Sequence, residues 1–133
     1  MSKVIDRDFI YLIWKDFKTR KRYTIAELTK NGKYEFKYRI NDVKNAIENG
    51  FEPLIAFPNI YEVYENYDIF PAFSSRLPDK RRKDVKEILA NYKLEKYDAF
   101  ELLKKSGGKL LTDSLEFIDP TFIDETNVYK IEA

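Results

Sequence analysis

The sequence contains neither cysteine nor histidine among its 133 residues. The lack of cysteine excludes disulfides, thiolate nucleophiles, iron–sulfur clusters and cysteine-rich zinc sites. The lack of histidine excludes histidine-based catalytic triads and histidine-ligated metal sites. We therefore predict a chain that is not an enzyme in its own right and that holds neither a cofactor nor a metal.

Glycine is scarce, and long apolar runs are missing. The pair Gly107-Gly108 follows a predicted helix, whereas a phosphate-binding loop has its glycines before the helix. No apolar run approaches the roughly 18 residues that cross a bilayer. Residues 1–8 also lack the basic segment and apolar core of a secretion signal. We expect a cytoplasmic chain that does not contact membranes.

Charge of one sign is not in excess, because 24 lysines and arginines nearly balance 23 aspartates and glutamates. A dedicated nucleic-acid-binding protein usually carries a basic excess, so this balance counts against that role but leaves local patches open. Hydrophobic residues make up 44% of the chain and aromatic residues 16%, enough to bury a sizeable core. The length predicts one domain over residues 1–133, with residues 120–133 as a tail that can be flexible.

The first forty residues carry strand patterns. The apolar run at residues 9–14 predicts a buried strand, and residues 22–29 predict a second strand with an irregularity near Ala26. Asn31-Gly32 predicts a two-residue type I′ turn, because both residues tolerate positive φ. Apolar and charged side chains then alternate over residues 33–39, which predicts a return strand with one buried face.

Helical periodicity and turn residues organise the rest of the chain. Asn41 is placed to cap a helix that ends before Gly50, and Pro78-Asp79 opens the strongest helical pattern. The predicted helices span residues 42–49, 60–64, 79–92 and 97–105. A brief strand or extended segment is expected at 53–58, and short strands are expected at 109–111 and 115–118.

The order of these elements is a hairpin sheet, then helices, then strands again. Strands that are segregated from helices indicate an α+β fold rather than a doubly wound sheet. We predict a small antiparallel sheet, built from N-terminal hairpins and C-terminal strands and packed with three to four short helices.

Several motifs follow one another between residues 69 and 118. They are FSSRLPD at 73–79, YDAFELL at 97–103, the pair Gly107-Gly108 and LEFI at 115–118. Their order and spacing resemble the amino-terminal subdomain of HipA-type toxin kinases, which has a Leu-Pro-acidic step, an Asp-x-Phe-x-Leu-Leu helix, a glycine turn and a closing strand. The chain departs from that pattern at residues 112–114, where Thr-Asp-Ser replaces a Gly-Ala pair.

The resemblance implies a sheet-and-helix module that precedes the catalytic domain in HipA-like kinases and helps to contact partner proteins. In three-gene relatives the module is a separate small protein, HipS, which inhibits its companion kinase. The N-terminal module of bacterial HIRAN-domain proteins is also similar. The implied function is a protein-interaction module that binds and regulates a HipA-like kinase, another protein subunit or a toxin–antitoxin complex. The predicted partner contacts are Phe73, Arg76, Leu77, Asp79, Lys80, Arg81, Arg82 and Lys83.

A nucleic-acid-binding accessory role is the alternative. Cations cluster at residues 15–22 and again at 80–83, in a first helical turn where the helix macrodipole disfavours them. A plain solvated surface is the competing interpretation of both clusters. The possible nucleic-acid contacts are Lys15, Lys18, Arg20, Lys21 and Arg22, together with residues 80–83.

Two other features have both a functional and a structural interpretation. Trp14 and the aromatic residues between 61 and 73 could form a partner surface, but we favour packing for both. The carboxylates Glu62, Glu65 and Asp68 could serve an enzyme, but no base, nucleophile or phosphate loop lies near them in the sequence.

Overall fold

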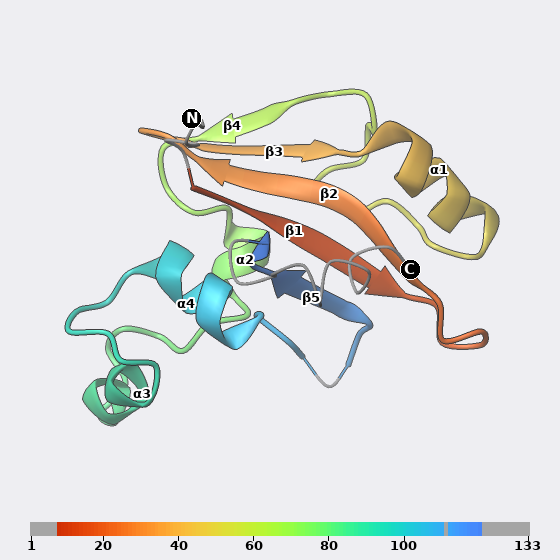
Figure 1. The fold of residues 1–133 in the computed structure, drawn as a ribbon. Helices are drawn as coiled ribbons and strands as arrows, with labels where there is room; N and C mark the ends of the chain where they lie inside the picture. Colours follow the sequence, from red (N-terminus) through yellow and green to blue (C-terminus); the bar gives the residue numbers. More distant parts are fainter. Residues whose placement is uncertain (1–7, 111, 121–133) are drawn as a thin grey trace, which may run out of the picture.

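Five strands form one antiparallel sheet in the computed structural model of this chain, which describes residues 8–110 and 112–120. The spatial order is β4-β3-β2-β1-β5 (Figure 1). The sheet is accompanied by four short helices within the described residues, which confirms the predicted α+β fold. The strands are β1 (Asp8–Lys15), β2 (Arg22–Lys30), β3 (Tyr34–Tyr38), β4 (Tyr64–Asn66) and β5 (Leu115–Ile118), and the helices are α1 (Ile40–Glu48), α2 (Pro71–Ser74), α3 (Val85–Asn91) and α4 (Ala99–Ser106).

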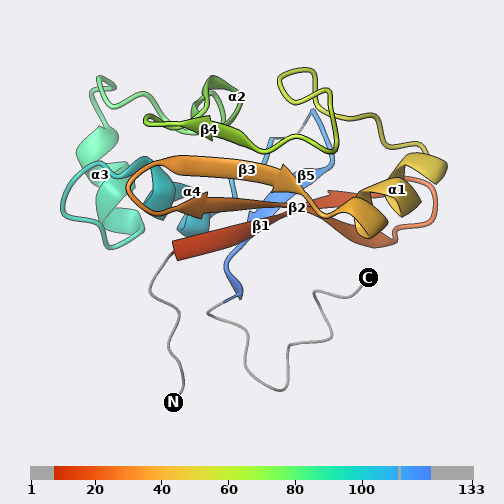
Figure 2. The ribbon, with the colours of Figure 1, turned by 90° about the horizontal axis from the view of Figure 1, so that it is seen from above.

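The core lies on one face of the sheet. Phe36 of β3 packs against Phe57 and Phe73, whose ring centroids are 4.2 and 5.4 Å away. Phe73 also contacts Phe117 of β5, at 4.9 Å. Figure 2, which is turned by 90° from Figure 1, shows α2 and the connection before β4 together on one side of β3 and β2. Since a fully buried phenylalanine contributes roughly 2–3 kcal/mol, this aromatic cluster is a main link between the sheet and the segments that cover it.

The β2–β3 hairpin is confirmed, but the predicted two-residue turn is wrong. Lys30 pairs with Tyr34, so residues 31–33 form a three-residue connection. Within it Gly32 alone has a positive φ, +80°, whereas a type I′ turn needs two such residues. A two-residue turn would shift the register by one and place Phe36 opposite Glu27. In the structure Phe36 opposes Leu28, and both are fully buried, so burial selects the longer turn.

The β1–β2 pair contains a bulge where the sequence predicts an irregularity. Leu12 opposes Ala26 and Ile13 opposes Thr24, which leaves Ile25 as the extra residue in the ladder. A bulge changes the direction of consecutive side chains, and here both Ile25 and Ala26 are fully buried. The Ile25 carbonyl accepts a hydrogen bond from the backbone N–H of the residue before α1, at 2.8 Å. The bulge therefore attaches the start of α1 to β2.

Helix α1 begins earlier than predicted. Arg39, rather than Asn41, is the N-cap residue. Arg39 Nε donates a hydrogen bond to Asp42 Oδ2 at 2.9 Å, which holds a carboxylate in the first turn, where the helix macrodipole favours it. The predicted end of the helix is confirmed, because Asn49 is the C-cap residue and Gly50 follows it.

The helix predicted at residues 60–64 is wrong, and residues 53–58 contain a turn rather than a strand. The Tyr38 hydroxyl accepts a hydrogen bond from Leu54 N at 3.0 Å and donates one to Phe57 O at 2.7 Å, which ties this turn to β3. Tyr64 then begins β4 opposite Phe36, and its ring packs on Phe57 at 4.9 Å. Pairing with β3 and this aromatic contact outweigh the weak helical pattern.

The two later helices differ in how well the sequence predicts them. Helix α3 begins at Val85 rather than at Asp79, and the residues before it form local ion pairs instead, Arg81 with Asp79 and Arg82 with Asp84. Helix α4 agrees with its prediction to within two residues at each end. Its N-cap residue Asp98 accepts a hydrogen bond from Glu101 N at 3.1 Å, as a capping carboxylate does.

The C-terminal strand predictions are partly confirmed. Strand β5 lies at Leu115–Ile118, as predicted. Lys109 and Leu110 lie outside any strand, while Leu111 and the predicted tail beyond Pro120 fall outside the described residues. Across residues 8–110 and 112–120, no helix has the length and apolar character needed to cross a membrane.

Candidate functional site

Three of the predicted partner contacts point into the protein. Phe73 is a core residue with only 1% of its surface exposed, and Leu77 packs against the same core while partly buried. Arg76 follows α2, and its side chain is only 8% exposed. All three therefore stabilise the fold, and any contact that they make with a partner is limited to the small part of their surface that is exposed.

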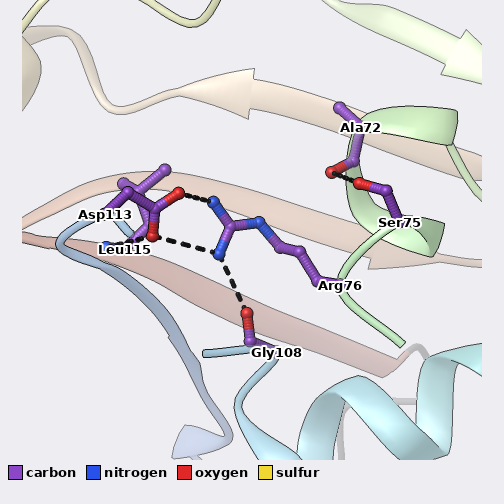
Figure 3. Close-up of polar contacts among 6 residues, drawn as sticks. All are labelled: Ala72, Ser75, Arg76, Gly108, Asp113 and Leu115. Carbon is purple, nitrogen blue, oxygen red and sulfur yellow. Dashed lines mark hydrogen bonds and ion pairs between the residues drawn. The ribbon is translucent and has the colours of Figure 1, made fainter. Parts of the chain in front are cut away.

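Arg76 joins the end of α2 to the turn that precedes β5 (Figure 3). Its Nη1 donates a hydrogen bond to Gly108 O at 2.9 Å, and its guanidinium forms an ion pair with the Asp113 carboxylate. Asp113 Oδ1 also accepts a hydrogen bond from Leu115 N at 3.3 Å. Charge-assisted bonds of this kind are stronger than neutral ones, so the network fixes the position of two surface segments relative to each other.

The other predicted partner contacts, residues 79–83, form an exposed segment before α3. Arg81 donates hydrogen bonds to both Asp79 oxygens, at 3.1 and 2.9 Å, and these bonds lower the pKa of Asp79 to about 2. Arg82 binds Asp84 in the same way, with two bonds of 2.8 Å. The two arginines are therefore neutralised locally by neighbouring aspartates.

The two lysines of the same segment differ from the arginines. Within residues 8–110 and 112–120, neither Lys80 nor Lys83 forms an ion pair with a carboxylate. Both side chains are exposed. The segment thus presents two ammonium groups that are available to an acidic ligand.

A pocket of about 410 Å³, here called the α3 pocket, lies beside this segment. Three cations, Arg76, Arg82 and Lys109, take part in its lining. Its apolar wall combines α3 and α4 with segments on either side of them in the sequence. The apolar side chains of this wall are Leu77, Ile88, Tyr92, Leu102 and Leu110.

The β1–β2 connection is an ordered loop organised by Asp16. The Asp16 carboxylate accepts hydrogen bonds from Thr19 Oγ1 at 2.8 Å and from Lys18 N at 3.0 Å, and these bonds lower its pKa. The backbone of Asp16 closes the loop with two hydrogen bonds. Its N–H donates to Lys21 O, and its carbonyl accepts a hydrogen bond from Arg20 N. These bonds fix the backbone on both sides of the exposed loop tip.

A second pocket, of about 630 Å³, lies against this loop and is here called the hairpin pocket. One of its carboxylates, Glu116, is paired with Arg22 at 2.9 Å and with Lys109 at 3.8 Å. The other, Asp113, is paired with Arg76. Lys15 and Arg20 have no ion-pair partner within the described ranges. The charged and apolar lining residues are Lys15, Arg20, Arg22, Lys109, Asp113, Glu116, Phe17, Leu110 and Leu115.

The two pockets adjoin each other, because Lys109 and Leu110 line both. The structure thus brings three of the five predicted nucleic-acid contacts, Lys15, Arg20 and Arg22, to one pocket. Lys18 and Lys21 lie on the same loop but outside the pocket lining, and Lys21 Nζ sits 5.7 Å from the ring centroid of Tyr23.

Phe17, Lys109 and Leu110 line the hairpin pocket although the sequence patterns do not predict them as contacts. Phe17 was detectable as a lone aromatic residue within a polar connection between two strands. No local pattern identifies Lys109 or Leu110, because their role depends on where the chain places them in space.

The remaining aromatic residues divide between core and surface. Trp14 packs against Tyr23 and Phe51, with centroids 5.6 and 5.5 Å away, which agrees with the packing interpretation. Phe70 is buried like Phe73, whereas Tyr61 and Tyr67 are exposed. Packing therefore explains only part of the aromatic passage.

The carboxylates considered for catalysis do not form a metal site. Lys33 Nζ lies 2.7 Å from Glu65 Oε1, and this contact lowers the pKa of Glu65. Among the described residues, no group of three or more acidic side chains is arranged to hold a metal ion.

Comparison of the chain with protein families, curated proteins and solved structures found no match. The two pockets and their charges are therefore the features that indicate a function.

Proposed function

We propose that this chain is a non-catalytic protein-interaction module that binds and regulates a separate HipA-like kinase, alone or within a toxin–antitoxin complex. The observation that carries the proposal is the α3 pocket, where an apolar wall lies beside the cationic segment 79–83. Protein interfaces gain much of their affinity from a bulky apolar anchor that enters such a pocket. In this proposal residues 1–133 act as one cytoplasmic domain that needs no cofactor.

The charges beside the pocket define the chemistry of the expected partner segment. Lys80 and Lys83 lack carboxylate partners among the described residues, and Lys109 takes part in the pocket lining. Complementary charge raises the rate of association and fixes the register of a bound segment. The partner segment should therefore carry an apolar or aromatic anchor next to aspartate or glutamate.

The resemblance to HipA-type kinases supports the same surface. Leu77 of the motif at 73–79 and Leu102 of the motif at 97–103 both line the α3 pocket. Residues 112–114, where the chain departs from the family pattern, include Asp113, which is paired with Arg76. The family motifs therefore contribute to the pocket wall, and the departing turn is used to hold that wall in place. Regulation by this surface would be steric.

Co-expression with a HipA-like kinase from the same organism tests the proposal. We expect the two proteins to co-purify. The triple variant R81Q/R82Q/K83Q should retain much less kinase, because it removes one free lysine and leaves Asp79 and Asp84 without their arginines, so that the charge of residues 79–84 changes from +2 to −1. The double variant K37Q/K44Q removes exposed cations of β3 and α1 and should retain the kinase fully. If the triple variant binds as well as the wild type, segment 79–83 is not the contact. If no complex forms with the wild type, the proposal itself is wrong.

A further inference from the structure

Phe17 is a feature that kinase binding through the α3 pocket does not explain. Its side chain is 87% exposed at the tip of the β1–β2 loop, where a polar residue would serve the fold equally well. The hydrogen bonds of Asp16 hold the loop backbone on both sides of the tip. The aromatic ring is therefore presented to solvent from an ordered loop.

Arg20 adds a second unexplained feature. It has a φ of +68°, a conformation that costs a non-glycine residue free energy and that glycine or asparagine adopts more easily. An arginine that persists in such a position points to a use for its side chain. Arg20 lines the hairpin pocket with Phe17, and it has no ion-pair partner among the described residues.

The charge around Phe17 is predominantly positive. Four cations and two carboxylates line the hairpin pocket. Glu116 is shared by Arg22 and Lys109, and Asp113 is paired with Arg76, so Lys15 and Arg20 keep their charge without an ion-pair partner among the described residues. The exposed Lys18 and Lys21 of the loop add further positive charge. The net charge of +1 for the whole chain thus conceals a local basic surface.

We propose that the hairpin pocket binds single-stranded nucleic acid, with a base stacked on Phe17 and the phosphates near Lys15, Arg20 and Lys109. A cationic groove combined with an exposed aromatic ring is the arrangement by which proteins bind single strands without sequence preference. An unpaired base can cover the Phe17 ring, whereas the bases of a duplex are already stacked on each other. This site does not depend on kinase binding, because its distinctive residues lie outside the α3 pocket.

Fluorescence anisotropy with labelled oligo(dT) and oligo(U) of about 12 nucleotides tests the site. We expect saturable binding that weakens steeply as salt rises. The F17A variant should bind about tenfold more weakly, since one stacked base is lost, and F17Y should restore most of the affinity. The matched control is Y67A, which removes another aromatic side chain, one that is 80% exposed and follows β4; its affinity should be unchanged.

The charge variant is R20N, because asparagine tolerates positive φ, so the substitution removes the guanidinium without adding backbone strain. We expect the slope of log affinity against log salt to become shallower by about 0.7, while K37Q leaves it unchanged. Three results would overturn the proposal. They are undetectable or salt-insensitive binding, equal losses in F17A and Y67A, and equally tight, Phe17-dependent binding of an oligoglutamate of the same charge.

Kinase binding and nucleic-acid binding can fail separately. F17A leaves every residue of the α3 pocket intact, so it should co-purify with the kinase as the wild type does. A loss of kinase binding in F17A would instead show that the hairpin is part of the protein interface.

Discussion

Arg76 is the residue whose removal should most disturb the candidate surface. Its guanidinium is largely buried and binds both the Gly108 carbonyl and the Asp113 carboxylate. R76A leaves these acceptors without their partner, so we expect the free energy of unfolding to fall by about 2–3 kcal/mol, measured by urea denaturation. R81A is the matched control, because the Arg81 side chain is 87% exposed and an exposed ion pair contributes little. Equal losses in the two variants would contradict this account of Arg76.

Tyr38 gives the fold a pH dependence that can be measured. Burial raises the pKa of Tyr38 to about 12, from an ordinary value of 10.0. The folded state thus favours the neutral phenol. The contribution of this phenol to the free energy of unfolding is complete below pH 10 and is lost as pH rises through about 12. At neutral pH, Y38F should cost about 1–2 kcal/mol, because Leu54 N and Phe57 O lose their partner. The difference in free energy of unfolding between Y38F and the wild type should shrink as pH rises from about 10 to about 12. A difference that stays constant over this range would contradict the assigned role of Tyr38.

The turn between α4 and β5 is the element in which added volume should be least tolerated. Gly108 has a φ of +56°, and an added Cβ would lie 2.9 Å from Leu103 Cδ2, which is buried. At Gly32, where φ is +80°, nothing lies within 4 Å of an added Cβ. We expect G32A to cost about 1–2 kcal/mol from backbone strain alone, and G108A to cost a further 1–3 kcal/mol or so from overpacking. Urea denaturation of both variants decides this, and a G108A cost no larger than that of G32A would contradict it.

Elements with strong local signals could be predicted from the sequence. The alternation in β3 and the glycine pair 107–108 that follows α4 each specify a structure within a few residues. The late start of α3 and the strand at β4 could not be read in this way. In both places other contacts compete with a local helical pattern. Before α3 these contacts are the ion pairs of Asp79 and Asp84. At β4 the competing contact is the pairing of Tyr64 with Phe36.

The candidate site shows the same division. The basic residues at 15–22 and 80–83 are visible in the sequence as clusters, and the structure leaves most of them on the surface. Phe73 and Arg76 look equally accessible in the sequence but lie inside the protein. The pockets themselves could not be predicted, because each unites side chains that are far apart in the chain, such as Leu77 with Leu110.

At the scale of the whole molecule, the two pockets form one continuous stretch of surface that shares Lys109 and Leu110. A ligand in either pocket changes the surroundings of these two residues. Since coupling between two sites is reciprocal, a kinase that contacts Lys109 and a nucleic acid that contacts it should each alter the affinity of the other.

Isothermal titration calorimetry of this chain with a HipA-like kinase from the same organism tests the proposed kinase binding through the α3 pocket most directly. I88D places a carboxylate in the pocket wall, whereas I55D changes a side chain that is 98% exposed in the turn before β4. With both variants shown by circular dichroism to be folded, we predict saturable wild-type binding that I55D preserves and that I88D weakens at least about tenfold. Undetectable wild-type binding, or I88D binding as tight as that of I55D, would contradict the account.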